Sequence, residues 1–190
     1  MIFDFAIVGL GNPEPERKNT RHNLGFLALE RLLHEFGRDQ TWSDTGKCRT
    51  AKAQINEHSI LLVLPYSGMN ESGQALNTAL GSADYGELIL VYDDLDLRPD
   101  QIKVVKGAKR DQHRGVQDIN DALGYSDYLR VRGGIGHPRN LAESPAVLPW
   151  VLSEASNELA EQFLQTTQRS AQAVIELVEN GLLSAQQKFH

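Results

Sequence analysis

A mostly apolar run, a glycine-containing turn and an amphipathic helix pattern open the chain and restrict its possible folds. Residues 3–8 predict a buried strand. The motif Gly9-Leu10-Gly11-Asn12-Pro13 follows, and its glycines permit a sharp turn while its proline ends the strand. Residues 23–36 then show helical periodicity, with Gly37 as the expected end. In an α/β fold, the loop between such a strand and helix lies at the carboxyl edge of the sheet, where ligand crevices form.

Strand and helix patterns alternate through most of the rest of the 190-residue chain. We predict strands at 46–55, 59–64, 87–92, 101–105 and 128–135, and helices at 74–80, 113–123 and 156–180, with Gly181 ending the last helix. This order predicts an α/β fold, a three-layer α/β/α sandwich with a mixed, mostly parallel sheet, in one domain over residues 1–190. Residues 139–149 read as irregular, either a mobile flap over a cleft or a plain connector.

The composition predicts a soluble, cytoplasmic protein. No apolar run approaches the length of a membrane span, and the N-terminus lacks the pattern of a signal peptide. The single cysteine, Cys48, cannot form an internal disulfide and belongs to no metal-binding spacing.

Charge is distributed unevenly along the chain. The net charge is −6, but residues 98–139 carry nine Lys and Arg against five Asp, so this stretch is +4 and the remainder is −10. A basic surface of this kind could hold a phosphate backbone, and a solvated face of mixed charge explains the counts equally well.

Polar side chains suited to acyl chemistry follow three of the predicted strands. Asn12 and His22 lie in the first loop, Asn70 in the loop at 65–73, and Asp93 directly after the strand at 87–92. An imidazole can take a proton near neutral pH, an amide can fix a substrate or water, and a carboxylate can orient the imidazole. Each residue taken singly also has a structural explanation as a turn, a helix cap or a solvated charge.

Ordered motifs resemble those of the bacterial peptidyl-tRNA hydrolases, and the resemblance runs nearly end to end. The motifs are Gly9-Leu10-Gly11-Asn12-Pro13, Thr20-Arg21-His22-Asn23-Leu24-Gly25, Met69-Asn70-Glu71-Ser72-Gly73, Asp93-Asp94-Leu95-Asp96-Leu97 and Arg132-Gly133-Gly134-Ile135-Gly136-His137-Pro138. The resemblance implies a monomeric α/β hydrolase that cleaves the ester joining a peptide to the 3′ end of tRNA, without a metal or cofactor.

The same resemblance implies roles for individual residues. His22 would be the general base, Asp93 would hold its other ring nitrogen, and Asn12 and Asn70 would contribute amide groups to substrate and developing charge. The expected contacts to substrate and tRNA are Met69, Arg17, Lys106, His113, Arg114 and Arg132. No Ser or Cys stands beside the base in these motifs, so hydrolysis without a covalent intermediate is expected. Ser67 and Ser72 leave a nucleophilic route barely open.

The departures from the family fall on the substrate side. Where the family has a glycine-rich loop ending in His-Asn-Gly, this chain reads Gly107-Ala108-Lys109-Arg110-Asp111-Gln112-His113-Arg114-Gly115, so Arg114 replaces an amide. Glu14 and Arg17 replace a glycine and a tyrosine, and Val105 occupies the usual position of a phosphate-binding lysine, with Lys106 adjacent. Retention of Asn12, His22, Asn70 and Asp93 together favours an active hydrolase. A hydrolase for another acyl ester, such as an aminoacyl-tRNA of a specialised pathway, a non-catalytic RNA-binding protein and a small-molecule-binding domain are the alternatives.

Overall fold

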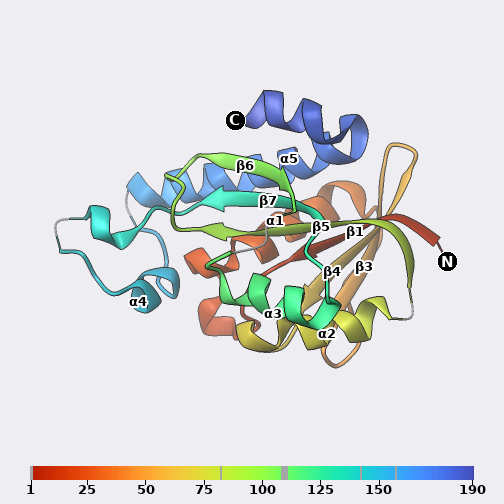
Figure 1. Ribbon diagram of the computed structural model, residues 1–190, viewed down its shortest axis with the longest axis horizontal. Coiled ribbons are helices and arrows are strands. Elements are labelled where there is room, and N and C mark those ends of the chain that lie inside the picture. The colour runs from red at the N-terminus through yellow and green to blue at the C-terminus, as the bar shows by residue number, and fades with distance from the viewer. Residues whose placement is uncertain (1, 82, 108–110, 142, 157) are drawn as a thin grey trace.

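The computed structural model describes residues 2–81, 83–107, 111–141, 143–156 and 158–190 (Figure 1). The strands are β1 (Ile2–Gly9), β2 (Ser43–Asp44), β3 (Cys48–Ile55), β4 (His58–Pro65), β5 (Asp84–Asp94), β6 (Ile102–Lys106) and β7 (Leu129–Gly134). The helices are α1 (Leu24–Phe36), α2 (Ser72–Leu80), α3 (Arg114–Leu123), α4 (Val147–Val151) and α5 (Glu158–Phe189), with 3-10 turns η1 (Pro15–Arg17), η2 (Arg21–Asn23), η3 (Met69–Glu71) and η4 (Pro138–Asn140).

One mixed sheet forms the centre of the molecule, with the strand order β2-β3-β4-β1-β5-β7-β6. The four central strands β4, β1, β5 and β7 are parallel, and antiparallel strands flank them on both sides. In the parallel register Gly9 lies opposite Val91, and Asp93 lies opposite Gly133. The loop that leaves β1 therefore starts beside the end of β5.

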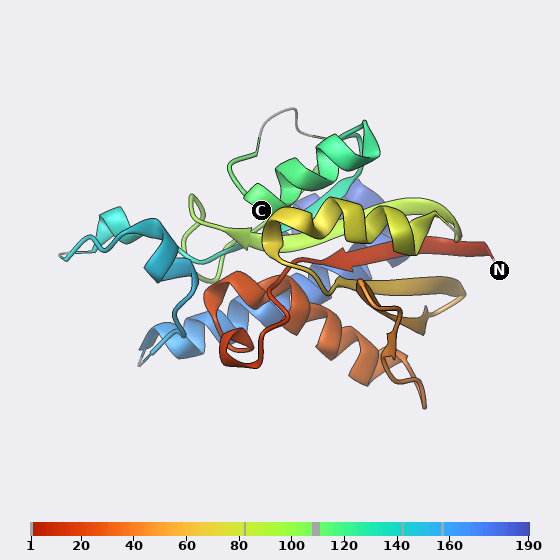
Figure 2. The same cartoon turned by 90° about the horizontal axis from the view of Figure 1, so that it is seen from below.

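Helices cover both faces of the sheet, which confirms the predicted α/β/α sandwich (Figure 2). Helices α1 and α5 pack on one face, and α2 and α3 pack on the other. The core has a cluster on each side, and the leucines of α1 at positions 24, 29 and 32 are fully buried in the first of them. Burial of each such side chain stabilises the fold by about 1.5–3 kcal/mol.

The N-terminus of α1 packs directly against the end of β1. A Cβ atom on Gly25 would lie 2.3 Å from the carbonyl oxygen of Val91, and one on Gly9 would lie 2.4 Å from the carbonyl oxygen of Gly25. The predicted reason for the early glycines was a sharp turn, but Gly9 and Gly11 have no positive φ. Gly9 and Gly25 are needed because they allow backbone to approach backbone, and Gly11 is needed because a Cβ atom there would lie 2.5 Å from the Phe26 ring. The approach at Gly9 and Gly25 brings η2 close to the sheet edge.

Two helical features differ from the prediction. The segment 139–149 is not wholly irregular, because α4 begins at Val147; Pro149 is compatible with it since a proline is tolerated in the first turn of a helix. Gly181 does interrupt α5, with φ of 79°, but the chain resumes helical geometry and continues to Phe189. None of the helices in the described part of the chain is both long and apolar enough to cross a membrane.

The last turns of α5 lie along β6, which is the outer strand on its side of the sheet (Figure 1). The Gln186 side chain donates to the carbonyl oxygen of Val104 at 3.0 Å, and the Val104 amide donates to Nε2 of His190 at 2.9 Å. Side chains from the C-terminal segment therefore occupy backbone hydrogen-bonding groups that β6 does not share with β7.

Candidate active site

His22 and Asp93 meet at the carboxyl edge of the central strands. His22 lies in η2, just before α1, and Asp93 lies at the end of β5. Nδ1 of His22 is 2.8 Å from Oδ1 of Asp93, a hydrogen bond between residues 71 positions apart. The carboxylate accepts the Nδ1 proton, so the lone pair of the ring lies on Nε2, which has no hydrogen-bond partner among the described residues.

The charges of this pair determine their protonation states. Burial lowers the pKa of His22, but the negative charge and hydrogen bond of Asp93 outweigh burial and leave this pKa above its ordinary value. Burial raises the pKa of Asp93, and the charges and hydrogen bonds of the neighbouring imidazoles reverse that effect, so the Asp93 carboxyl has a pKa well below its usual range. Asp93 is therefore ionised near neutral pH beside an imidazole that can accept a proton there.

A second imidazole, that of His113, shares the same carboxylate oxygen. Nε2 of His113 is 3.1 Å from Oδ1 of Asp93, and the rings of His22 and His113 lie 4.8 Å apart between centroids. His113, expected from the resemblance to contact substrate or tRNA, lines the cavity beside His22. The structure also brings its ring to the carboxylate that holds the general-base candidate, with only 6% of its side chain exposed.

Asn12 presents an unused amide in the same loop. Its backbone amide donates to Oδ1 of Asn23 at 2.7 Å, and its backbone carbonyl accepts from Nδ2 of Asn23 at 2.9 Å. The Asn23 side chain therefore fixes the Asn12 backbone, while the buried Nδ2 of Asn12 has no partner in the described part of the chain. A buried donor without a partner is costly, so this amide is suited to a ligand oxygen. Sequence reasoning assigned no role to Asn23, although it adjoins His22.

The other predicted site residues in the first two loops are Arg17, Met69 and Asn70, and their surroundings differ. Arg17, in η1, is near enough for its positive charge to lower the pKa of His22. Met69 is buried in η3, and its sulfur would lie 2.7 Å from a Cβ atom on Gly115, so it packs beneath the start of α3. The backbone of Asn70 is in η3 beside it, and the predicted role of the Asn70 side chain lies outside the described part of the structure.

A cavity of about 420 Å³ opens beside His22 and Asp93. Arg132 and Arg114 line it, as do the apolar residues Val147 and Leu148 of α4. Nη2 of Arg132 is 2.6 Å from Oδ2 of Asp94, so this predicted phosphate contact is ion-paired in the free protein. The end of the 139–149 segment therefore borders the site rather than serving only as a connector.

Several basic residues lie away from the cavity. Lys106 forms an ion pair with Glu87 at 2.8 Å. It lies opposite Leu129, at the start of β7, whereas Asp93 lies opposite Gly133, near the end of β7. Lys106 and Asp93 are therefore at opposite edges of the sheet. Arg21 is buried against the Trp150 ring, 3.7 Å from its centroid, and Arg130 is also fully buried. Arg21 and Arg130 therefore present no guanidinium group at the surface, and the burial of Arg130 makes the basic surface of residues 98–139 smaller than its residue count suggests.

The site offers no activated nucleophilic side chain among the described residues. Cys48 is buried and donates to the carbonyl oxygen of Ala75, and burial raises the pKa of its thiol to about 11. Ser72 is buried with its hydroxyl bonded to the carbonyl oxygen of Met69, and the Ser67 hydroxyl donates to the carbonyl oxygen of Glu71. A water molecule is the nucleophile that this arrangement favours.

His22, Asp93 and His113 also form the one group in the described part of the chain whose side chains could hold a metal ion, with ligand atoms within 4.8 Å of one another. Nδ1 of His22 and Nε2 of His113 donate to Asp93, so these two nitrogens would have to lose their protons before they could bind a metal. The geometry is that of a hydrogen-bonded cluster, and the expectation that activity needs no metal stays a prediction.

Comparison with known proteins shows the family of the chain. Residues 6–190 match the model of the family described as peptidyl-tRNA hydrolase. The chain belongs to the peptidyl-tRNA hydrolase family. Peptidyl-tRNA hydrolase from Renibacterium salmoninarum is 36% identical over 190 residues, covering 98% of this chain and 96% of that protein, and the one from Bdellovibrio bacteriovorus is 32% identical over 188 residues, covering 98% and 99%. The crystal structure of peptidyl-tRNA hydrolase from Acinetobacter baumannii has a TM-score of 0.83 and 27% identity, covering 100% of this chain and 96% of that one.

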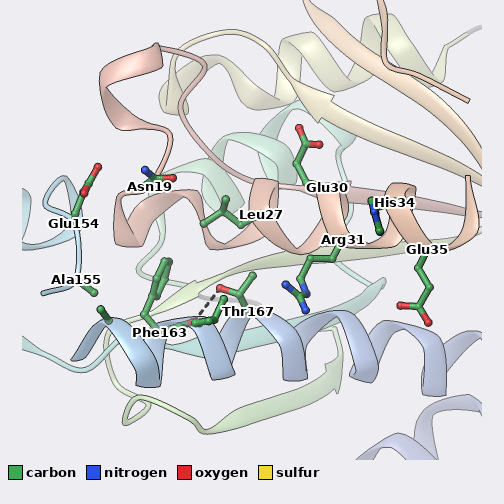
Figure 3. Close-up of a pocket in the computed structure, with 12 residues that line it drawn as sticks. Asn19, Leu27, Glu30, Arg31, His34, Glu35, Glu154, Ala155, Phe163 and Thr167 are labelled. Carbon is green, nitrogen blue, oxygen red and sulfur yellow. Dashed lines mark hydrogen bonds between the residues drawn. The ribbon is translucent and has the colours of Figure 1, made fainter. Parts of the chain in front are cut away.

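This member of the peptidyl-tRNA hydrolase family has another cavity, of about 820 Å³, between α1 and α5 (Figure 3). It is larger than the one beside His22, yet it contains none of the predicted site residues. Leu27 and Phe163 line its apolar part, and Glu30, Arg31 and Glu35 lie along its length. Size alone therefore does not select the candidate active site here, and the hydrogen-bonded pair of His22 and Asp93 beside the smaller cavity is the basis for choosing that cavity.

Proposed function

We propose that this chain hydrolyses the ester bond of peptidyl-tRNA with His22 as the general base. The observation that carries the proposal is the 2.8 Å hydrogen bond between Nδ1 of His22 and Oδ1 of Asp93 at the edge of the cavity. It supports a tautomer with a lone pair on Nε2, which takes a proton from water as the water attacks the ester carbonyl. Family membership supports the choice of ester.

The remaining steps follow from the same side chains. The free Nδ2 of Asn12 donates to the substrate, and it stabilises the negative charge that develops on the carbonyl oxygen. Asp93 stabilises the imidazolium that forms at His22. The imidazolium then gives its proton to the leaving ribose oxygen of the terminal nucleotide, the C–O ester bond breaks, and the products are a free peptide and tRNA.

The proposal extends to the binding of tRNA. The cavity contains two arginines, Arg114 and Arg132, and Arg17 lies near His22; guanidinium groups suit phosphate oxygens. We further propose that the protein acts as a monomer in the cytoplasm and needs no metal, so that its rate survives dialysis against EDTA.

A hydrolysis assay on purified protein tests the proposal. The substrates are an N-acetylated aminoacyl-tRNA, which stands for peptidyl-tRNA, and the same aminoacyl-tRNA without the acetyl group. His22→Ala is expected to lower turnover of the acetylated substrate by roughly a hundredfold or more, because the general base is lost. His34→Ala removes an exposed imidazole from the same helical region and serves as the matched control.

Each contrary outcome identifies an alternative. Cleavage of only the unacetylated substrate would show a different acyl ester as the natural target. Retention of tRNA without cleavage, equal for the unmutated protein and His22→Ala, would show a non-catalytic RNA-binding protein. Equal turnover by the unmutated protein and His22→Ala would remove His22 from the mechanism.

A further inference from the structure

A buried polar network lies beneath the loop that carries His113. It joins Tyr92 of β5, Arg130 of β7 and Asp111 of the loop before α3. Tyr92 and Arg130 are fully buried, and only 6% of the Asp111 side chain is exposed. The Tyr92 hydroxyl donates to Oδ2 of Asp111 at 2.5 Å, and Nη1 of Arg130 lies 3.4 Å from the same oxygen.

Asp111 also determines the backbone conformation just before α3. Its Oδ1 accepts from the backbone amide of His113 at 2.9 Å, the two-residue pattern of an Asx turn. Its carbonyl oxygen accepts from the Gln117 side chain at 2.6 Å. One residue thus connects two strands of the sheet to the first turn of α3.

The His113 ring depends on this anchoring. It makes an edge contact with the Tyr92 ring, 5.2 Å between centroids, and Nε2 faces Oδ1 of Asp93 at 3.1 Å. The other nitrogen, Nδ1, is buried and has no hydrogen-bond partner among the described residues. The ring is therefore held by its backbone, by Tyr92 and by Asp93, and two of these three depend on Asp111.

The network is expensive to build for stability alone. A buried ion pair recovers its desolvation cost only partly, and apolar residues of similar size often stabilise a core as well or better. Holding the His113 ring in one orientation is a role that would account for the network.

We propose that Asp111 is a positioning residue for the hydrolytic centre. Through Tyr92 and Arg130 it fixes His113 against Asp93, and this contact orients the carboxylate that His22 uses. The inference rests on the proposed function for its effect on turnover. Its structural part, the placement of His113, stands independently of any assay of hydrolysis.

A double-mutant cycle tests whether Asp111 acts through His113. The single-turnover rate on N-acetylated aminoacyl-tRNA is measured for the unmutated protein, Asp111→Asn, His113→Ala and the double variant. Asp111→Asn is expected to lower the rate roughly ten- to hundredfold, with little change in substrate affinity. In the His113→Ala background the same substitution is expected to change the rate by less than about twofold, because its target is already gone.

If the double variant loses rate by the product of the two single losses, Asp111 does not act through His113 and the proposal is overturned. An unchanged rate in His113→Ala would also overturn it. Asp4→Asn is the matched control, because Asp4 likewise accepts a backbone amide and a hydroxyl, both from Ser59, and it lies at the start of β1. Should Asp111→Asn fail to fold, Tyr92→Phe removes one donor to Asp111 while keeping the ring, and it is expected to show the same dependence on His113.

Nitrogen-15 NMR of the imidazoles gives a second readout that needs no turnover. His113 is expected to carry its proton on Nε2 in the unmutated protein, and to show mixed tautomers in folded Asp111→Asn or Tyr92→Phe. Unchanged His113 resonances in these variants would refute the placement itself. If the His113 resonances change in the variants as expected but turnover does not depend on His22, the proposed function is refuted and the placement of His113 stands.

Discussion

Substitution of Asp93 by Asn is the most direct probe of the hydrolytic pair. It removes the negative charge 2.8 Å from the His22 ring while keeping the size of the side chain. The charge centres of a carboxylate and an imidazolium in such contact are about 4 Å apart, which gives about 4 kcal/mol at an effective dielectric constant of about 20. Both side chains are largely buried, so solvent screening reduces this figure little.

The proton is only partly on His22 in the transition state, so about half of this energy, about 2 kcal/mol, contributes to the barrier. At about 1.4 kcal/mol per tenfold change, the loss is roughly thirtyfold. The Asn amide can also donate to Nδ1 and favour the tautomer that carries no lone pair on Nε2, which increases the loss further. We expect Asp93→Asn to lower kcat/KM between roughly thirtyfold and a thousandfold.

The pH dependence supplies the second half of this test. Asp93 raises the pKa of His22, and the active form of His22 is neutral, so kcat/KM rises with pH through that pKa. Without the carboxylate the pKa falls, and the acidic limb of the profile is expected to move to lower pH. Single-turnover hydrolysis measured across the pH range reports both effects, with Asp4→Asn as a control for the loss of a carboxylate elsewhere. An unchanged rate together with an unchanged acidic limb would refute the reasoning.

Three further substitutions address substrate, tRNA and fold. Arg114→Asn restores the amide usual in the family and is expected to raise kcat/KM on N-acetylated aminoacyl-tRNA about three- to tenfold, the value of one hydrogen bond; a fall would show that Arg114 makes a contact of its own. Arg132→Gln is expected to weaken tRNA binding and to reduce by about one the slope of log affinity against log salt concentration, and an unaltered slope would exclude a phosphate contact. Gly25→Ala forces a Cβ atom against the Val91 carbonyl oxygen and is expected to cost about 1–3 kcal/mol, measured as a lower midpoint in thermal unfolding; a midpoint equal to that of the unmutated protein would show that the backbone yields there.

The sequence alone predicts the part of the site that depends on strand ends. His22 follows the first strand and Asp93 ends another, and parallel strands bring their carboxyl ends to one edge, so their meeting follows from topology. The same reasoning does not apply to Lys106, because β6 is antiparallel and its end lies at the opposite edge. Adjacency in sequence to the usual lysine position therefore does not bring its ammonium group to the cavity.

The remaining differences come from side chains whose partners are distant in sequence. The contact between His113 and Asp93 depends on Asp111 and its bonds to two strands, which no local pattern indicates. Arg130 looks like a surface charge in the alternating pattern of β7, but the structure buries it against Asp111, the carbonyl oxygen of Ser126 and the Tyr128 ring. Gly181 is a helix terminator by local rules, and the helix resumes after it because the segment beyond packs along β6.

The docking of the C-terminal segment on β6 affects more than the local packing. An outer strand with free amide and carbonyl groups can recruit a strand from another molecule, which leads to aggregation or to exchange of segments between copies. Gln186 and His190 occupy both groups of Val104, so they block this side of the sheet to an incoming strand. The C-terminal segment thus covers the open side of β6, a five-residue outer strand that would otherwise be available for pairing.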